Sequence, residues 1–346
     1  MIYFDNAATT RPDEECLSAA AKYLTDKFYN PSALYAEGYN LHVELAQSRV
    51  NILSHIADPD DYSMIITSCG TEADNQAIFC GGRRGNIVTT MGEHAAIFAS
   101  AQEAGRRGVE VIHVNNETGA INDINAIAAK VKAKNAHTLF HSDGVQAFGK
   151  IPFRLGANVD MYSLSAHKIG ALKGTGALIK KKKLQINPYI WGGGQEGGLR
   201  SGTENVFGIK MLEFASEKAY KDIRRRAENI SAIRERLWSL LDKNLFSRIS
   251  PENGSPYILC VAAAGVRGET ILHMCDDESL IIGTGSACSS NAAKKHSRVM
   301  QACGIGTELI DGVLRLSFCA STTVAEAEEA AAILNETVQK DKDLTK

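Results

Sequence analysis

The apolar positions in the first half of the chain follow two different periods. Between residues 33 and 57, Leu41, Leu45, Ile52 and Ile56 recur at helical spacing among polar residues, which predicts an amphipathic helix. From there, short apolar runs typical of buried strands alternate with further helical stretches. The predicted strands are residues 64–67, 87–90, 109–114, 138–141, 160–164 and 176–179, and the predicted helices between them are residues 71–80, 95–106 and 124–134. This alternation predicts an α/β fold with a mostly parallel sheet.

A second pattern begins at residue 205, where a charge-rich helical stretch extends to about residue 244. The elements that follow are apolar runs at residues 257–262, 280–283 and 313–318 and an alanine- and glutamate-rich helix at residues 324–339. We therefore predict a large α/β domain over residues 16–245 and a small α+β domain formed by residues 1–15 and 246–346.

Composition narrows the classes of function. The 346 residues are 44% hydrophobic and 23% charged, which is ordinary for a globular protein. The formal net charge of -2 gives no reason to expect direct binding to nucleic acid or to an anionic membrane. No apolar run approaches the roughly 20 residues of a membrane-spanning helix, and the first residues lack the layout of a signal peptide. We expect a cytoplasmic protein that acts on small molecules or on other proteins.

The eight cysteines contain no CxxC pair, and neither an HExxH motif nor a cluster of histidines is present. A disulfide framework and a metal site are therefore not expected. Cys288 lies in a run of small and polar residues, 283–290, which predicts an exposed loop. The other seven cysteines have surroundings typical of packed residues.

Two charged residues follow consecutive strands of the predicted sheet. Asp143 comes just after the strand at 138–141, and Lys168 comes just after the strand at 160–164. The carboxyl ends of parallel strands share one edge, where such sheets bind ligands. A lysine and a carboxylate together suit pyridoxal phosphate, because the lysine can form a Schiff base with its aldehyde and the carboxylate can keep its ring nitrogen protonated. Taken singly, each residue is more often a loop, turn or cap residue.

Three further features support this site, and each also has a simpler explanation. Residues 68–72 lie between a strand and a helix, where main-chain amides, Gly70 and two hydroxyls could bind a phosphate or merely cap the helix. His94 follows another strand at the same edge and could stack on a planar ring or serve as a structural hydrogen-bonding group. Residues 192–194 and 200–203, Gly-Gly-Gly and Arg-Ser-Gly-Thr, could hold an anion or act as a hinge.

Two other patterns are a glycine-rich loop at residues 144–150 and an arginine in an apolar strand. Residues 144–150 match most of a GxxxxGK phosphate-binding loop, but Ile151 stands where a hydroxyl must bind magnesium and Pro152 interrupts the helix, which argues against nucleotide hydrolysis. Arg315 lies in the apolar strand at 313–318 and needs an anionic partner. A substrate carboxylate and a structural Asp or Glu are equally consistent with the sequence.

Together, these motifs resemble the cysteine desulfurases, a group of fold type I pyridoxal phosphate enzymes in the class V aminotransferase family, and specifically those with a long cysteine loop. The resemblance covers essentially the whole chain. Its landmarks are residues 3–10 (YFDNAATT), 70–75 (GTEADN), 93–94 (EH), 114–119 (VNNETG), 141–146 (HSDGVQ), 165–168 (SAHK), 200–203 (RSGT) and 285–288 (GSAC).

The resemblance implies a role for each matching residue. Lys168 would form the Schiff base, Asp143 would face the ring nitrogen, Gln146 would contact the ring hydroxyl oxygen, and His94 would stack on the ring and shuttle protons. The residues implied for the phosphate are Thr71, Ser165, His167 and, from the neighbouring subunit, Thr203, and those implied for the substrate carboxylate are Asn116 and Arg315. The site would then be complete only in a homodimer.

The reaction implied by the resemblance is removal of sulfur from L-cysteine. The substrate would replace Lys168 on the cofactor and lose its α-proton, and the Cys288 thiolate would then take the sulfur as a persulfide, releasing L-alanine. A mobile loop suits a cysteine that must pass sulfur to an acceptor protein, such as an iron-sulfur scaffold or a tRNA-thiolation enzyme. The acceptor is left open. A selenocysteine lyase, a class V aminotransferase and a catalytically impaired scaffold in a sulfur-transfer complex are the alternatives.

The chain departs from this family in one segment. Members usually have about thirty further residues before the Asn-Asn-Glu motif, whereas here Val114 runs directly into Asn115. We predict that one edge strand is lost and that residues 109–114 take a more central position. A smaller departure is Ala166, where the family usually has glycine.

Overall fold

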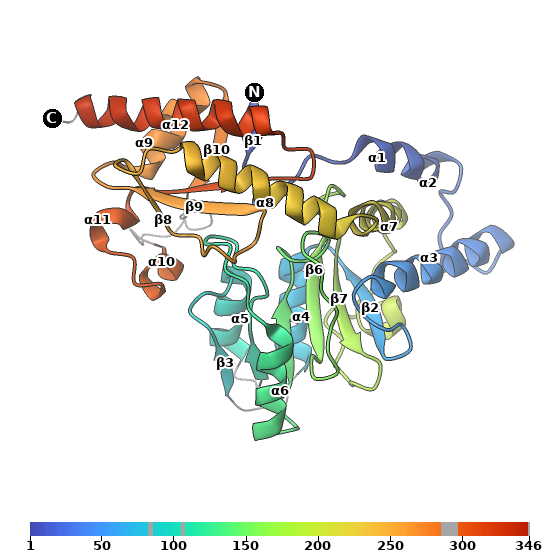
Figure 1. The fold of residues 1–346 in the computed structure, drawn as a ribbon. Helices are drawn as coiled ribbons and strands as arrows, with labels where there is room; N and C mark the ends of the chain where they lie inside the picture. The colour runs from blue at the N-terminus through green and yellow to red at the C-terminus, as the bar shows by residue number, and fades with distance from the viewer. Residues whose placement is uncertain (82–85, 105–107, 285–296, 345–346) are drawn as a thin grey trace. The chain divides into compact units, whose positions relative to one another are not determined.

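The structure, a computed structural model, describes residues 1–81, 86–104, 108–284 and 297–344 (Figure 1). The chain forms two compact units. The large unit contains Arg11–His113 and Asn122–Ile223, and the small unit contains Met1–Thr10, Val114–Ile121 and Arg224–Lys346. These units differ from the predicted domains mainly at residues 114–121 and 224–245, and the assignment of functional domains stays a prediction.

A sheet with strand order β2-β7-β6-β5-β4-β3 forms the centre of the large unit. The strands are β2 (Tyr62–Thr67), β3 (Ile87–Thr89), β4 (Gly108–Glu110), β5 (Phe140–Asp143), β6 (Met161–Ser165) and β7 (Gly176–Lys181). Strands β3 to β6 are parallel to one another, and β7 is antiparallel to both of its neighbours. The predicted α/β fold with a mostly parallel sheet is thereby confirmed.

Helices pack on this sheet, and every side chain of its inner strands β5 and β6 is buried. The helices of the large unit are α1 (Glu14–Ala20), α2 (Lys22–Thr25), α3 (Ala36–Ser54), α4 (Gly70–Gly81), α5 (Ala95–Ala104), α6 (Ile124–Lys134) and α7 (Val206–Tyr220), with short 3-10 helices η1 (Ala166–Lys168) and η2 (Glu196–Gly198). Leu45 and Ile52 of α3 share one core with Tyr162 and Leu164 of β6 and Ile209 of α7. This packing holds β6 in place, and the strand in turn positions the residues that follow it.

The small unit is built on a mixed sheet with strand order β1-β10-β11-β9-β8. Its strands are β1 (Ile2–Phe4), β8 (Phe246–Arg248), β9 (Ile258–Ala263), β10 (Leu280–Thr284) and β11 (Val313–Ser317), and its helices are α8 (Ile223–Leu240), α9 (Gly268–Asp277), α10 (Arg298–Ala302), α11 (Thr307–Ile310) and α12 (Val324–Leu344). Leu237 of α8, Ile271 of α9 and Leu334 of α12 pack with strand residues in one apolar core. The N-terminal strand β1 is parallel to β10, so the first residues of the chain belong to this sheet.

Two elements differ from the sequence-based prediction. The helical stretch at 205–244 is two helices, α7 and α8, rather than one. Strand β4 ends at Glu110, although the amides of Val111 and His113 still donate to main-chain oxygens of β5. Since β4 lies between β3 and β5, the segment occupies an inner position of the sheet, as predicted. None of the helices within the described residues is long and apolar enough to cross a membrane.

Candidate active site

The predicted site residues of the large unit gather at one edge of its sheet. Asp143 ends β5, Ser165 ends β6, and Lys168 ends the short helix η1 that follows β6. The loop after β3 contains His94. Because β3, β5 and β6 are parallel, their carboxyl ends lie at the same edge, which is where α/β sheets bind ligands.

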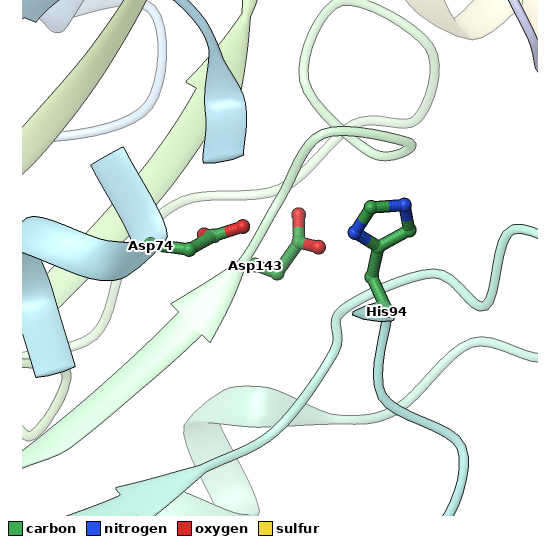
Figure 2. Close-up of side chains that lie close together, drawn as sticks. All are labelled: Asp74, His94 and Asp143. Carbon is green, nitrogen blue, oxygen red and sulfur yellow. The ribbon is translucent and has the colours of Figure 1, made fainter. Parts of the chain in front are cut away.

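Asp143 is the centre of a buried acidic group. Its carboxylate is 4% exposed, and Oδ1 accepts a hydrogen bond of 2.8 Å from the amide of Val145. Figure 2 shows Asp143 between Asp74 of α4 and His94, and one polar atom from each of the three lies within 4.8 Å of the others. Nδ1 of His94 accepts a hydrogen bond of 3.2 Å from the amide of Ala96, so Nε2 carries the hydrogen when the ring is neutral.

Two carboxylates and an imidazole at this spacing could also hold a metal ion, which the sequence did not suggest. A cation needs anionic carboxylates as ligands. Burial and the charge of Asp143 raise the pKa of Asp74 well above its usual range, which favours a protonated carboxyl. The arrangement therefore suits a protonated Asp74 better than it suits a pair of anionic ligands.

The residues around Lys168 suit an anion. Oγ of the buried Ser165 has no hydrogen-bond partner among the described residues. Burial and the nearby charges of Lys168, Lys173 and Lys150 lower the pKa of His167 to about 4. Burial is the largest cause of this shift, and the three lysines add to it; their positive charges would attract a phosphate placed here.

The turn before α4 lies close to these residues. A Cβ atom at Gly70 would come 2.8 Å from Cγ2 of Val145 and 3.4 Å from Cβ of Ser165, so only glycine allows this approach. The amides at the start of α4 are thereby brought beside the end of β6, as expected for a phosphate site. Thr71 follows Gly70 and is exposed.

Arg200, which the sequence offered as a possible anion-binding residue, forms an ion pair with Glu72. Its Nε donates a hydrogen bond of 2.8 Å to Oε1 of Glu72. Burial by itself would raise the pKa of Glu72, but Arg200 and the hydrogen bond from the Ser68 amide outweigh it and lower that pKa. Nearby, Thr203 is exposed and available for contact with another molecule.

Gln146 has a fixed orientation. Its Oε1 accepts a hydrogen bond of 2.7 Å from Nζ of Lys150, and both side chains are buried. Because Lys150 can only donate, this hydrogen bond identifies the side-chain atom near Lys150 as the oxygen of Gln146 and places its amide nitrogen on the other side.

Asn116 and Arg315 lie in the small unit and contact each other there. Arg315 donates hydrogen bonds of 3.0 Å from Nη1 to the main-chain oxygen of Asn116 and of 2.7 Å from Nη2 to Oδ1 of Asp5. Asp5 is thus the acidic partner that the sequence left open. Nε of Arg315 is buried without a hydrogen-bond partner within the described residues, which leaves a donor for a further anion.

Cys288 falls within residues 285–296 and therefore lies outside the described residues. Of the cysteines expected to be packed, four are buried, and burial raises the pKa of Cys275 to about 11; the four are Cys16, Cys80, Cys260 and Cys275. Cys303 is exposed, so the prediction that it belongs to the core was wrong. It follows the last residue of α10, where the side chain is open to solvent.

Sequence analysis missed three buried residues of this region, Asp74, Glu110 and His141. One signal was present, since His141 precedes Asp143 by two positions and therefore shares its strand face. The partnership of Glu110 with His141 depends on strand register, which the sequence does not specify.

Burial raises the pKa of Glu93, one residue before His94, to about 7, against the hydrogen bonds from Thr90 and the Ile112 amide. The folded chain therefore keeps a proton on Glu93 that the unfolded chain releases above its usual pKa of 4.5. The stabilisation by this proton is complete below that value and is lost as the pH rises to about 7. We expect the free energy of unfolding of the wild type, relative to Glu93→Gln, to fall by about 3 kcal/mol over this window.

Denaturant unfolding of both proteins at pH 5 and pH 8 measures this difference. The glutamine keeps an oxygen for Thr90 and Ile112 and matches the protonated acid, so the two proteins differ chiefly in the charge at high pH. A difference that stays constant between the two pH values would contradict the assignment.

Comparison with known proteins identifies the relatives of the chain. The aminotransferase class V family matches residues 2–114 and 107–329. The two matches overlap at residues 107–114, next to the predicted position of the missing segment. A cysteine desulfurase of Trichormus azollae is 31% identical over 382 aligned residues, covering 98% of this chain and 93% of the relative. The alignment is longer than the 346 residues of this chain, so part of the relative has no counterpart here.

Solved structures agree with this relationship. A NifS-like protein from Rickettsia africae has a TM-score of 0.88 and 28% identity, covering 99% of each chain. SspA in complex with cysteine has a TM-score of 0.77 and 25% identity, covering 93% of this chain and 100% of that one. The chain therefore belongs to the aminotransferase class V family and, within it, to the cysteine desulfurases.

Proposed function

We propose that this protein is a pyridoxal phosphate-dependent enzyme that removes sulfur from L-cysteine, giving L-alanine and a persulfide on Cys288. The observation that carries the proposal is the pairing of a buried Asp143 with Lys168 at the carboxyl ends of adjacent parallel strands, beside His94. Relatives named cysteine desulfurases over nearly the whole chain support the same reaction.

The residues at this edge fit pyridoxal phosphate. The unpartnered Ser165 hydroxyl, the excess positive charge near His167 and the close approach at Gly70 are the features that a phosphate group requires. The buried carboxylate of Asp143 has one oxygen engaged by Val145, which leaves the other for a protonated ring nitrogen. When bound, the cofactor withdraws electrons from the α-carbon of the amino acid.

Each residue then has a distinct task. Lys168 attaches the cofactor through its amine and afterwards accepts or returns a proton. Asp143 holds the ring nitrogen protonated, and Gln146 donates its amide to the ring hydroxyl oxygen. His94 covers the ring and moves a proton through Nε2, since its Nδ1 is engaged by the Ala96 amide.

Substrate binding is assigned to Asn116 and Arg315, whose mutual contact in the small unit leaves Nε of Arg315 for a carboxylate. That the SspA relative was solved in complex with cysteine supports L-cysteine as the substrate class. Cys288 accepts the sulfur and passes it to an acceptor protein.

A homodimer is part of the proposal. The segment from α2 to α3 exposes several large apolar side chains, and exposure of such a group to water is unfavourable in free energy. They are Leu24 (59%), Phe28 (69%), Leu34 (102%), Tyr35 (50%) and Tyr39 (64%). Contact with a second copy would cover them, and the exposed Thr203 would then be free to reach the phosphate of that copy.

The test is incubation of the cofactor-loaded protein with L-cysteine and a reductant, with alanine and sulfide measured together. We expect equal amounts of both products from the wild type. With Cys288→Ser we expect a loss of about 10³-fold or more, because serine keeps the size of the side chain but cannot take sulfur as a persulfide. Cys303→Ser, an exposed cysteine changed in the same way, is the control.

Alanine formation by Cys288→Ser at the wild-type rate would overturn the role of Cys288. Formation of a keto acid without sulfide would show transamination, and would favour the alternative that the protein is a class V aminotransferase. Sedimentation of the same preparation measures whether the chain is a dimer in solution.

A further inference from the structure

A row of buried polar side chains crosses the sheet beneath the candidate active site. In the strand register, Glu110 of β4 lies opposite His141 of β5, and Asp143 lies opposite Ser163 of β6. Glu110 is 4% exposed, and His141 and Ser163 are fully buried. Polar groups this deep must find hydrogen-bond partners within the protein.

The row forms one chain of hydrogen bonds. Nδ1 of His141 is bonded to Oε2 of Glu110, and Nε2 of the same ring lies 2.8 Å from Oγ of Ser163. Nε2 of His141 also lies 3.9 Å from Oδ1 of Asp74, and the Ser163 hydroxyl acts on the pKa of that carboxyl as a hydrogen-bonding neighbour. Since polar atoms of Asp74 and Asp143 lie within 4.8 Å of each other, the chain connects Glu110 to the immediate neighbour of Asp143.

Two arrangements of this chain contain the same number of protons. In the first, a neutral Asp74 donates to Ser163, Ser163 donates to Nε2 of His141, and Nδ1-H donates to the carboxylate of Glu110. In the second, Asp74 has passed its proton to Ser163 and Ser163 has passed its own to Nε2. Asp74 is then an anion and His141 an imidazolium, so the total charge is unchanged.

The first arrangement places a neutral group beside Asp143, and the second places a negative charge there. Burial and the acids that face Asp74, which are Asp143, Glu110 and Glu93, raise its pKa and outweigh the hydrogen bond with Ser163, which lowers it. The surroundings therefore favour the first arrangement.

We propose that Glu110 is a positioning residue for Asp143. By accepting the Nδ1 hydrogen of His141, it directs the hydrogen bonds through Ser163 so that Asp74 keeps its proton. Asp143 then has no second negative charge beside it at Asp74. The role toward Asp143 rests on the proposed function, whereas the direction of the hydrogen bonds does not.

The test begins with the cofactor-free protein labelled with ¹⁵N in its histidines. We expect His141, assigned by the signal lost in His141→Gln, to be neutral and to carry its hydrogen on Nδ1. In Glu110→Gln, the amide can donate to Nδ1, so we expect the hydrogen to move to Nε2. Glu103→Gln, an exposed acid of α5, is the control and should leave the signal unchanged. A hydrogen on Nε2 in the wild type, or no change in Glu110→Gln, would overturn the proposal.

The second readout is the absorbance of bound pyridoxal phosphate as a function of pH. Glu110→Gln and Ser163→Ala should both shift its apparent pKa by about one unit, and Glu103→Gln should not. Ser163→Ala removes only a hydroxyl and so tests the chain even if Glu110→Gln fails to fold. A changed histidine signal without a changed absorbance would overturn the role toward Asp143. Failure of the wild type to bind pyridoxal phosphate would instead overturn the proposed function.

Discussion

Lys168→Ala is expected to lower alanine formation from L-cysteine by about 10⁴-fold or more, because the amine that attaches the cofactor and carries its proton is lost. Lys168 ends η1, directly after the buried strand β6, so its backbone position is fixed by the core of the large unit. The measurements are the rate of alanine release and the retention of cofactor after borohydride reduction and denaturation. Reduction should leave the cofactor on the wild type and not on the variant.

Lys183→Ala is the matched control. This lysine is exposed in the turn after β7, so its loss should change neither rate nor labelling. Labelled cofactor retained by Lys168→Ala would show that another lysine attaches it, and the assignment of Lys168 would then be wrong.

Asp143→Asn is expected to lower the same rate by about 10³-fold while leaving the fold intact. Asparagine has the shape of aspartate and keeps an oxygen for the Val145 amide, which donates at 2.8 Å to Oδ1 in the wild type. What it lacks is the negative charge that would hold the ring nitrogen protonated. The variant should therefore lose rate and cofactor affinity but not thermal stability.

The comparison for this variant is Asp60→Asn, a change of the same kind at an exposed loop residue. An equal rate in Asp143→Asn and the wild type would exclude an ionic contact between Asp143 and the cofactor. A large fall in melting temperature would instead assign Asp143 a role in folding.

In the large unit β4 lies beside β5, and Glu110 of β4 is opposite His141 of β5. The segment that runs into the Asn-Asn-Glu motif therefore also contains the acid that we assign to the positioning of Asp143. The sheet still places Asp143 and Lys168 at the ends of neighbouring strands, which argues against a scaffold without activity.

The sequence by itself determined the alternating strands and helices of the large unit from residue 36 to residue 181 and the residues that end its strands. Those features depend on local periodicity, so Asp143, Ser165 and Lys168 could be assigned to one sheet edge without a structure. Their chemical roles were inferred from the surrounding motifs, because a motif is a set of residue types at fixed spacing and can be read from the local sequence. The helical stretch predicted for 205–244 is divided at Lys221 and Asp222, and the sequence did not reveal this break because it leaves the local pattern of polar and apolar residues almost unchanged.

Only the tertiary structure decided which charged groups are partners. Arg200 bonds to Glu72, Arg315 bonds to Asp5, and His141 bonds to Glu110. Each pair joins residues far apart in the chain, and its formation depends on strand register and on how helices pack against the sheet. Burial then sets the proton affinity of groups such as Asp74, because the energy of a charge depends on everything that surrounds it in space, and that surrounding is not a local property of the sequence.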